Sequence, residues 1–230
     1  MVIAEIEDNL QAVRERIAAA ARRAGRDPAE ITLVTVTKTQ PVEVIGVAYE
    51  LGLRDFGENR LEEAESKLDR LPDDIRWHMV GHVQSRKAAQ AVRPYALVHS
   101  VDSVKLARRL DRFAGEIGRT LPVLLEVNVS GEASKYGLQP ADVEAAVEAM
   151  RGFECLQIQG LMTMAPIVPD PEDARPVFVA LRELRERLAA RFPDLDWRHL
   201  SMGMTDDFEV AVEEGATIVR IGRAIFGERD

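Results

Sequence analysis

Disulfide bonds, membrane spans and an excess of positive charge are all missing from this 230-residue sequence. Its single cysteine, Cys155, excludes an internal disulfide and is typical of proteins kept in a reducing compartment. No apolar run approaches the roughly 18 residues of a transmembrane helix. The opening segment, MVIAEIEDNL, has acidic residues where a signal peptide has its apolar core. We therefore expect a cytoplasmic protein with no membrane partner.

The charge balance is acidic. The chain has 30 Lys and Arg residues against 39 Asp and Glu residues, which gives a formal net charge of -9. General affinity for nucleic acids depends on clustered basic residues, so we expect no nucleic-acid partner. A local basic pocket for a small phosphate ester remains compatible with this balance. The hydrophobic fraction of 46% is enough for a large core, and no exposed apolar seam stands out, so we expect a monomer.

Strand-like and helix-like segments alternate along the chain. An amphipathic helix comes first and ends before Gly25, a residue suited to a left-handed cap. Eight alternating units predict an α/β fold: a single (β/α)8 TIM barrel domain over residues 1–230, with an extra N-terminal helix. An open doubly wound sheet is the alternative, but no G-x-G-x-x-G follows the first strand. The expected strands are 31–38, 53–59, 75–81, 96–102, 121–130, 156–164, 196–203 and 216–222.

Polar and small residues stand where the expected strands end. The carboxyl ends of barrel strands form the binding mouth, so these residues should converge there. Lys38 ends the first strand and would belong to this site, although a strand-end lysine with its ammonium in water is the simpler alternative. The other residues at strand ends are Asn59, His78, His99, Asn128, Met162, Met164, Ser201, Gly203, Arg220 and Gly222.

The segments after the seventh and eighth strands suit a phosphate group. SMGMTDD and IGRA supply glycines whose backbone N–H groups can approach an anion, although the same glycines also suit plain tight turns. We expect Thr205 to cap the helix that follows. A lysine beside such a site, with Arg220 nearby, is suited to form a Schiff base with a phosphorylated aldehyde, which suggests pyridoxal 5′-phosphate. If Arg220 faces the pyridine nitrogen, that nitrogen stays unprotonated and the ring is a weak electron sink.

Several segments resemble the pyridoxal phosphate homeostasis protein family, and together they span residues 31 to 227. They include VTKTQP, FGENRLEEAESKL, WHMVGHVQSRK, EVNVSGEASKYGL and LSMGMTDDFEVAVEEGATIVRIGRAIFG. Arg86 departs from the family, whose members more often have asparagine there. The resemblance implies a barrel similar to the N-terminal domain of alanine racemase, with the cofactor held by Lys38 as an internal aldimine.

The resemblance also implies roles for further residues. Arg220 would face the pyridine nitrogen, and Lys135 would be a second, mobile lysine near the mouth. The phosphate would lie against the SMGMT backbone and the residues after the eighth strand. The full implied set around the cofactor is Asn59, His82 and Met162 near the ring, with Ser201, Gly203, Met204, Thr205, Gly222 and Arg223 around the phosphate.

A carrier role is the function we expect. Racemases with this barrel use a tyrosine from an added β-domain, and a chain that ends at Asp230 would lack it. Of the tyrosines Tyr49, Tyr95 and Tyr136, only the last could approach the mouth. We therefore expect a protein that holds pyridoxal phosphate without robust turnover and serves its homeostasis, with PLP-dependent apo-enzymes as candidate recipients. The alternative is a PLP-dependent amino-acid racemase or another Schiff-base enzyme.

A metal-dependent hydrolase is a further alternative. It would use His78, His82 and His99, and the first two have a spacing that could suit a ligand pair. However, the sequence contains no H-E-x-x-H motif, and the pair falls across a strand end instead of on a helix. We therefore expect no metal, and the histidines are better explained by hydrogen bonds within the fold.

Overall fold

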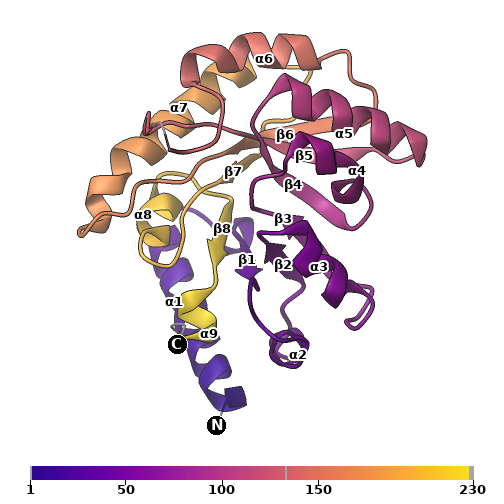
Figure 1. Cartoon of the computed structure of the whole chain (residues 1–230). Helices are drawn as coiled ribbons and strands as arrows, with labels where there is room; N and C mark the ends of the chain where they lie inside the picture. Colours follow the sequence, from indigo (N-terminus) through magenta and orange to yellow (C-terminus); the bar gives the residue numbers. More distant parts are fainter. Residues whose placement is uncertain (1, 133, 228–230) are drawn as a thin grey trace.

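Eight parallel strands close into a barrel in chain order, each paired with the strands before and after it and β8 paired with β1 (Figure 1). This closed order of parallel strands confirms the predicted TIM barrel. The computed structural model describes residues 2–132 and 134–227. The strands are β1 (Thr32–Val36), β2 (Asp55–Glu58), β3 (Arg76–Met79), β4 (Tyr95–Val101), β5 (Leu121–Glu126), β6 (Leu156–Met162), β7 (His199–Ser201) and β8 (Ile218–Ile221).

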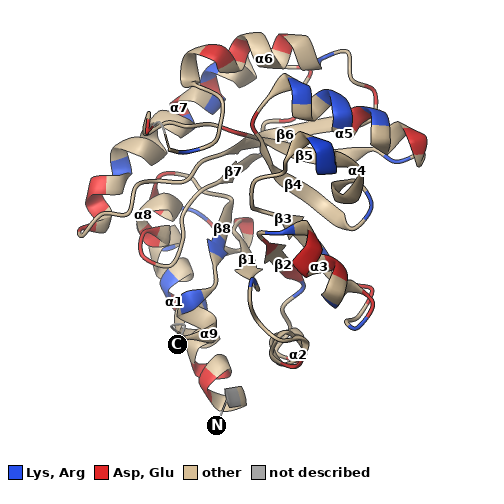
Figure 2. Cartoon of the chain, viewed as in Figure 1, with Lys and Arg blue, Asp and Glu red and all other residues tan. Residues whose placement is uncertain are grey.

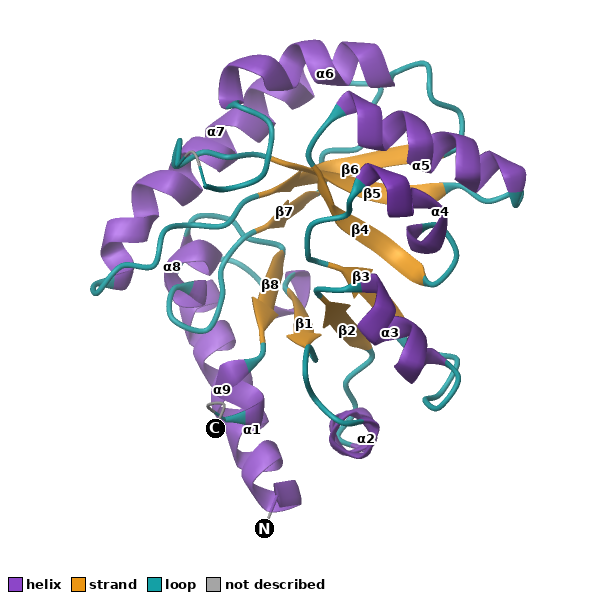
Figure 3. Cartoon of the chain, viewed as in Figure 1, coloured by secondary structure: helices purple, strands orange, loops and turns teal. Residues whose placement is uncertain are grey.

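Helices surround the strands on the outside of the barrel (Figure 3). The predicted N-terminal helix is present, and it packs along the helices that flank β8. That all of residues 1–230 form one domain stays a prediction, because residues 1, 133 and 228–230 lie outside the described part. The helices are α1 (Val2–Arg23), α2 (Val42–Glu50), α3 (Leu61–Leu68), α4 (Ala88–Ala91), α5 (Val104–Glu116), α6 (Val143–Met150), α7 (Arg175–Arg191), α8 (Phe208–Glu213) and α9 (Arg223–Phe226).

Local signals in the sequence explain where several helices begin and end. Ser103 precedes α5, and its hydroxyl accepts a hydrogen bond from the Leu106 N–H at 3.3 Å, which satisfies one of the free donors of the first turn. Gly25 follows α1 with φ of +67°, a left-handed conformation that glycine adopts without strain. The chain then turns into β1, and Arg26 ties this turn to α8 by donating to the Val212 carbonyl at 2.8 Å.

Side chains of the strands alternate between two environments. Those that point outward pack against the helices and form a large apolar layer, which we call the outer core. Those that point inward fill the lumen. Across the β1–β8 pair, Val34 lies opposite Arg220, and both side chains belong to the lumen. The apolar part of the lumen consists of Val34, Val80, Leu97, Leu124, Met162 and Ile218.

Charged residues lie mostly on the helices. Figure 2 shows α3 largely acidic and α5 largely basic, with only acidic charges on α6 and both signs mixed on α7. In the described part of the chain, no helix has the length and apolar character needed to cross a membrane. The expectation of a cytoplasmic location stays a prediction.

Candidate functional site

A hollow of about 570 Å³ opens where β1, β2 and β8 end, and this end of the barrel is the predicted mouth. It brings together residues from both ends of the sequence, because β1 and β8 are neighbours in the closed barrel. We call it the mouth hollow. It is lined by Val36, Lys38, Gln40, Asn59, Val80, Met164, Ile167, Met204, Thr205, Asp206, Arg220, Gly222, Arg223, Phe226 and Gly227.

A tight turn carries Lys38. The strand ends at Val36, two residues before the lysine, and the Gln40 N–H closes the turn by donating to the Thr37 carbonyl at 3.0 Å. Thr39 has φ of +65°, which is uncommon for a β-branched residue. Its N–H donates to the Glu63 carboxylate of α3, which compensates for part of this strain. The turn therefore places Lys38 in the lining of the mouth hollow.

A buried ion pair holds the backbone of this turn in place. Lys67 of α3 lies 2.7 Å from the Glu58 carboxylate and donates to the Thr37 carbonyl at 2.9 Å. The Thr37 hydroxyl donates to Glu58 at 2.7 Å. Burial raises the pKa of Glu58, although the hydrogen bonds from Lys67 and Thr37 oppose that shift. The backbone next to Lys38 is thus fixed by side chains from β2 and α3.

The β7 and β8 loops form the opposite wall. A Cβ added to Gly222 would lie 2.9 Å from the Val36 carbonyl oxygen, so only glycine fits there without displacing backbone. Thr205 does not cap α8 as predicted, because α8 begins at Phe208 after an Asp207 N-cap. The buried Asp207 carboxylate instead accepts from the Met204 N–H at 2.6 Å, which folds residues 204–207 into a turn before the helix.

Arg220 extends from β8 across the lumen, and only 5% of its surface is exposed. Its guanidinium donates to the Ser201 hydroxyl at 2.6 Å and to the Thr163 carbonyl at 2.9 Å. Burial lowers the pKa of Arg220 to about 10, while the nearby carboxyl groups of Asp207 and Glu126 oppose that shift. The guanidinium therefore remains charged at neutral pH, and it also lines the mouth hollow.

Ser201 lies in the lumen and not on the rim where the sequence suggests it. It is fully buried, and its hydroxyl lies 2.9 Å from the Nδ1 atom of His99 and accepts from Arg220. This oxygen is already engaged on both sides, so contact of its side chain with a phosphate would require breaking these bonds. The phosphate role of Ser201 stays a prediction.

Glu126 is a lumen carboxyl that the sequence analysis did not single out. It ends β5 with 3% of its surface exposed, and its Oε2 atom has no hydrogen-bond partner among the described residues. Burial raises its pKa to about 7, the negative charge of Asp102 adds to the shift, and Arg220 opposes it. A lone glutamate in the apolar strand LPVLLE was the available signal.

His82 and Lys135 lie on the β3–β5 side of the mouth, outside the lining of the mouth hollow. His82 is 3.0 Å from the Asp102 carboxylate and stacks on Tyr136, with ring centroids 3.7 Å apart. Lys135 lies 2.5 Å from the Glu132 carboxylate and donates to the Met164 carbonyl at 3.3 Å. Both therefore have local partners in this structure.

The mouth hollow thus unites one group of the predicted residues and leaves out another. Met162 and Gly203 are buried outside its lining, and Met164, which the family resemblance did not assign a role, lines it. The predicted residues that line the hollow are Lys38, Asn59, Met204, Thr205, Arg220, Gly222 and Arg223, and those outside its lining are His82, Met162, Ser201, Gly203 and Lys135.

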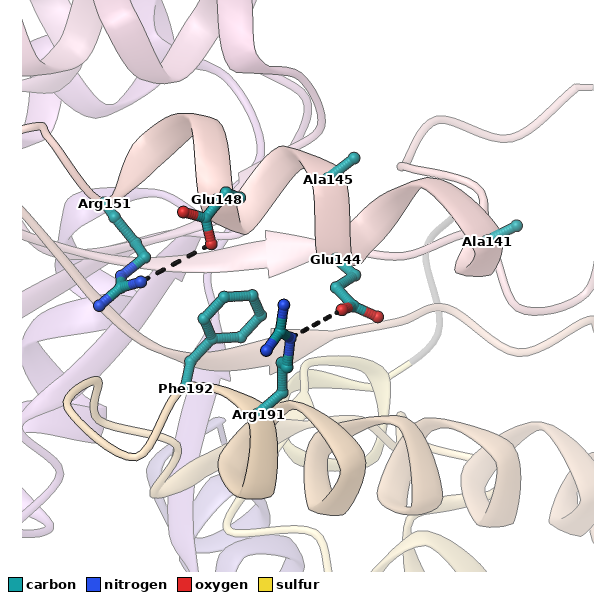
Figure 4. A pocket seen from close by; sticks show the side chains of 7 residues that line it. All are labelled: Ala141, Glu144, Ala145, Glu148, Arg151, Arg191 and Phe192. Carbon is teal, nitrogen blue, oxygen red and sulfur yellow. Dashed lines mark hydrogen bonds and ion pairs between the residues drawn. The ribbon is translucent and has the colours of Figure 1, made fainter.

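Figure 4 shows a groove of about 490 Å³ on the outside of the barrel, where α6 meets the end of α7 around Phe192. Its Arg191–Glu144 pair is solvent-exposed, and the groove is away from the strand ends. Within residues 2–132 and 134–227, no group of three or more His, Cys, Asp or Glu residues is arranged to hold a metal. His78 and His99 are bonded to each other, whereas His82 pairs with Asp102.

Comparison with known proteins gives the family. The alanine racemase N-terminal domain family matches residues 9–230. A pyridoxal phosphate homeostasis protein of Pseudomonas aeruginosa is 45% identical over 227 residues, which cover 98% of this chain and 96% of that protein. The chain belongs to the pyridoxal phosphate homeostasis protein family. Another member, from Aquifex aeolicus, is 43% identical over 223 residues, covering 96% of this chain and 97% of its own.

Solved structures agree with this membership. PipY of Synechococcus elongatus, solved with PLP bound, is 37% identical with a TM-score of 0.84, and the match covers 96% of this chain and all 100% of PipY. Alanine racemase of Clostridium difficile is only 12% identical with a TM-score of 0.72, and the match covers 94% of this chain but 59% of the racemase. That second likeness shows a shared barrel fold.

Proposed function

We propose that this family member binds pyridoxal 5′-phosphate in the mouth hollow, holds it through a Schiff base with Lys38, and serves PLP homeostasis without robust turnover. The observation that carries this proposal is the placement of Lys38 and Arg220 in one hollow with the β7 and β8 loops. When bound, PLP supplies an aldehyde for an amine and an anionic phosphate. Its presence in PipY and the names of the curated relatives support the same cofactor.

The residues present fit this cofactor. A phosphate needs close approach to backbone N–H groups, and the turn at Gly222, which packs so closely on β1 that only glycine fits, lines the mouth hollow. We assign the phosphate to the backbone of Thr205, Gly222 and Arg223, because the Met204 N–H already donates to Asp207. Arg220 has only donors to offer a ring nitrogen, which keeps that nitrogen unprotonated and weakens the ring as an electron sink. Such a site favours holding the cofactor over carbanion chemistry.

A spectroscopic experiment tests this assignment. Protein loaded with PLP should absorb in the visible range, and borohydride should fix the cofactor onto the peptide that contains Lys38. Lys38→Ala should lose the visible band, whereas Lys135→Ala is the matched control and should keep it, because Lys135 lies outside the lining of the mouth hollow. A Lys38→Ala protein that keeps the band would contradict the assignment.

The racemase alternative has its own readout. Tyr136 is 55% exposed and lies against His82, so a phenol stands on the β3–β5 side of the mouth. Incubation of the loaded protein with L-alanine in deuterated water should give no deuterium at the α-carbon above a protein-free control. Exchange that disappears in Tyr136→Phe would instead establish a proton-transfer enzyme.

Transfer to PLP-dependent apo-enzymes and a monomeric state complete the proposal. Mixing the loaded protein with an apo-enzyme should activate that enzyme faster than the PLP that dissociates into solution can. Size-exclusion chromatography with light scattering should give the mass of one 25.6 kDa chain. A doubled mass, or activation no faster than with the released PLP, would overturn the corresponding part.

A further inference from the structure

A continuous chain of hydrogen bonds crosses the barrel from its floor to its mouth. Asp55 begins β2 at the floor, and its carboxylate lies 3.0 Å from the Nε2 atom of His78. The Nδ1 atom of His78 lies 2.9 Å from Nε2 of His99. His99 reaches Ser201, and Ser201 reaches Arg220 at the mouth hollow. The chain joins side chains from β2, β3, β4, β7 and β8.

The two ends of this hydrogen-bond chain determine which groups donate and which accept along it. A guanidinium can only donate, so Arg220 donates to the Ser201 oxygen. At the other end, burial alone would raise the pKa of Asp55, but hydrogen bonds from His78 and Arg76 outweigh burial and lower the pKa to about 2. Asp55 is therefore an ionised acceptor. One end supplies protons to hydrogen bonds, and the other end receives them.

Only one arrangement of protons uses every donor between these ends. Ser201 donates its hydroxyl proton to Nδ1 of His99, whose Nε2–H donates to Nδ1 of His78, whose Nε2–H donates to Asp55. In the reverse arrangement, His78 carries a buried positive charge and Ser201 accepts from both Arg220 and His99. The Ser201 hydroxyl proton then has no acceptor among its recorded partners, which is costly in a fully buried group.

The environment of His99 keeps its ring neutral. This residue is fully buried, and burial lowers its pKa well below the usual value, with the positive charge of Arg220 adding to the shift. His99 is therefore neutral and has one donor and one acceptor nitrogen. A neutral imidazole that accepts a hydrogen bond at one nitrogen donates at the other. The direction of the hydrogen bond to Ser201 therefore determines the direction of the hydrogen bond to His78.

We propose that Asp55, His78 and His99 are positioning residues that orient the Ser201 hydroxyl and thereby fix the Arg220 guanidinium at the mouth. Asp55 lines a second hollow of about 520 Å³ at the barrel floor, so the chain connects the floor surface to the mouth hollow. The proposal rests on the proposed function only in that Arg220 meets PLP. A change in the charge of Asp55 at the floor therefore alters PLP binding at the opposite end of the barrel.

The direction of the chain can be measured in the protein without PLP. Long-range ¹H–¹⁵N spectra distinguish the two neutral forms of an imidazole, and we expect the Nε2–H form for both His78 and His99 at neutral pH. His99→Phe and His78→Gln assign the signals. An Nδ1–H form of His99 together with a doubly protonated His78 would overturn the proposal, whether or not the protein binds PLP.

The coupling from floor to mouth needs a matched pair of variants. Asp55→Asn keeps the shape but removes the charge of the chain's acceptor. Asp74→Asn makes the same change on an exposed floor carboxylate that pairs with Arg54 and lies outside the chain. We expect the His99 nitrogen signals to shift, and the PLP dissociation constant to rise about threefold, in the Asp55 variant alone. Equal His99 signals in both variants would overturn the coupling.

His99→Phe provides the larger perturbation of PLP binding. It removes both ring nitrogens, so we expect the PLP dissociation constant to rise about tenfold while the visible band with Lys38 is retained. A wild-type protein that binds no PLP would refute the proposed function. The imidazole spectra would still test the proposed direction of the hydrogen-bond chain. An unchanged dissociation constant in a folded His99→Phe protein would overturn the positioning role.

Discussion

The outer core and the lumen of the barrel are built from the same strands but from different residue types. The outer core joins strands to helices almost entirely through apolar side chains such as Phe178 and Leu181, both fully buried. The lumen holds a small apolar group and, next to it, His99, Ser201 and Arg220. Non-directional packing therefore stabilises the outer layer, whereas hydrogen bonds with specific partners organise the lumen.

From this difference we predict that the residues that determine stability and the residues that determine PLP binding lie in different parts of the barrel. Substitutions in the outer core should alter the free energy of unfolding and leave the affinity for PLP unchanged while the protein is folded. Substitutions in the lumen should alter pH dependence and PLP binding. The next four predictions test this division, from the largest expected effect to the smallest.

Phe178→Ala should have the largest effect on stability. Phe178 lies on α7 and is fully buried in the outer core, so its removal leaves a cavity between helix and barrel. We expect a loss of about 3–5 kcal/mol in the free energy of unfolding, measured by urea denaturation. The PLP dissociation constant, measured below the unfolding transition, should stay the same. A large change in affinity in the folded variant would show that the two regions are not separate.

Glu126→Gln should alter the pH dependence of stability. The folded protein raises the pKa of Glu126 from 4.5 to about 7, so the folded state holds this proton more tightly than the unfolded chain. The stabilisation that comes from the protonated Glu126 carboxyl is therefore fully present below about pH 4.5 and is lost as the pH rises through about 7. Over this window the wild type should lose about 3 kcal/mol relative to the variant.

Urea denaturation at several pH values measures this difference. Glu148→Gln is the matched control, because this side chain lies on the outer groove with 61% of its surface exposed. The gap between the wild type and Glu126→Gln should widen with pH, whereas the control should follow the wild type. Parallel curves for all three proteins would mean that the Glu126 carboxyl ionises as freely in the folded state as in the unfolded chain.

Ser103→Ala tests a local contribution in the outer layer. Its hydroxyl caps α5, so the substitution leaves the Leu106 N–H without this acceptor. We expect a loss of about 1 kcal/mol in the free energy of unfolding. Ser103→Asp should retain most of the stability, because aspartate also caps helices. Equal losses in both variants would point to packing of the serine and not to its capping bond.

The exposed pair in the outer groove should contribute least. Arg191 and Glu144 lie 3.1 Å apart, with 67% and 63% of their side chains exposed (Figure 4). A double-mutant cycle with Arg191→Ala and Glu144→Ala should give a coupling energy under about 0.5 kcal/mol, since water and salt screen such pairs. A coupling above about 1 kcal/mol would mean that this groove is more ordered than its exposure implies.

The sequence predicted the position of a residue at the mouth where that position follows from the end of a strand. Lys38 and Arg220 were placed at the mouth because parallel strands end on one side of the barrel, and both line the hollow there. The left-handed turn at Thr39 was not predicted, because it depends on Glu63 from the next helix but one. Ser201 was expected at the rim because it ends its strand, but it lies in the lumen, where its hydroxyl accepts from Arg220.

The sequence by itself determined the number and order of the elements. Apolar alternation, the Ser103 cap and the Gly25 turn depend only on neighbours within a few positions, so their signals can be identified in the chain without the fold. Only the tertiary structure decided the partners of the buried polar groups. His99 and Ser201 are 102 positions apart, and closure of the barrel is what brings them within one hydrogen bond.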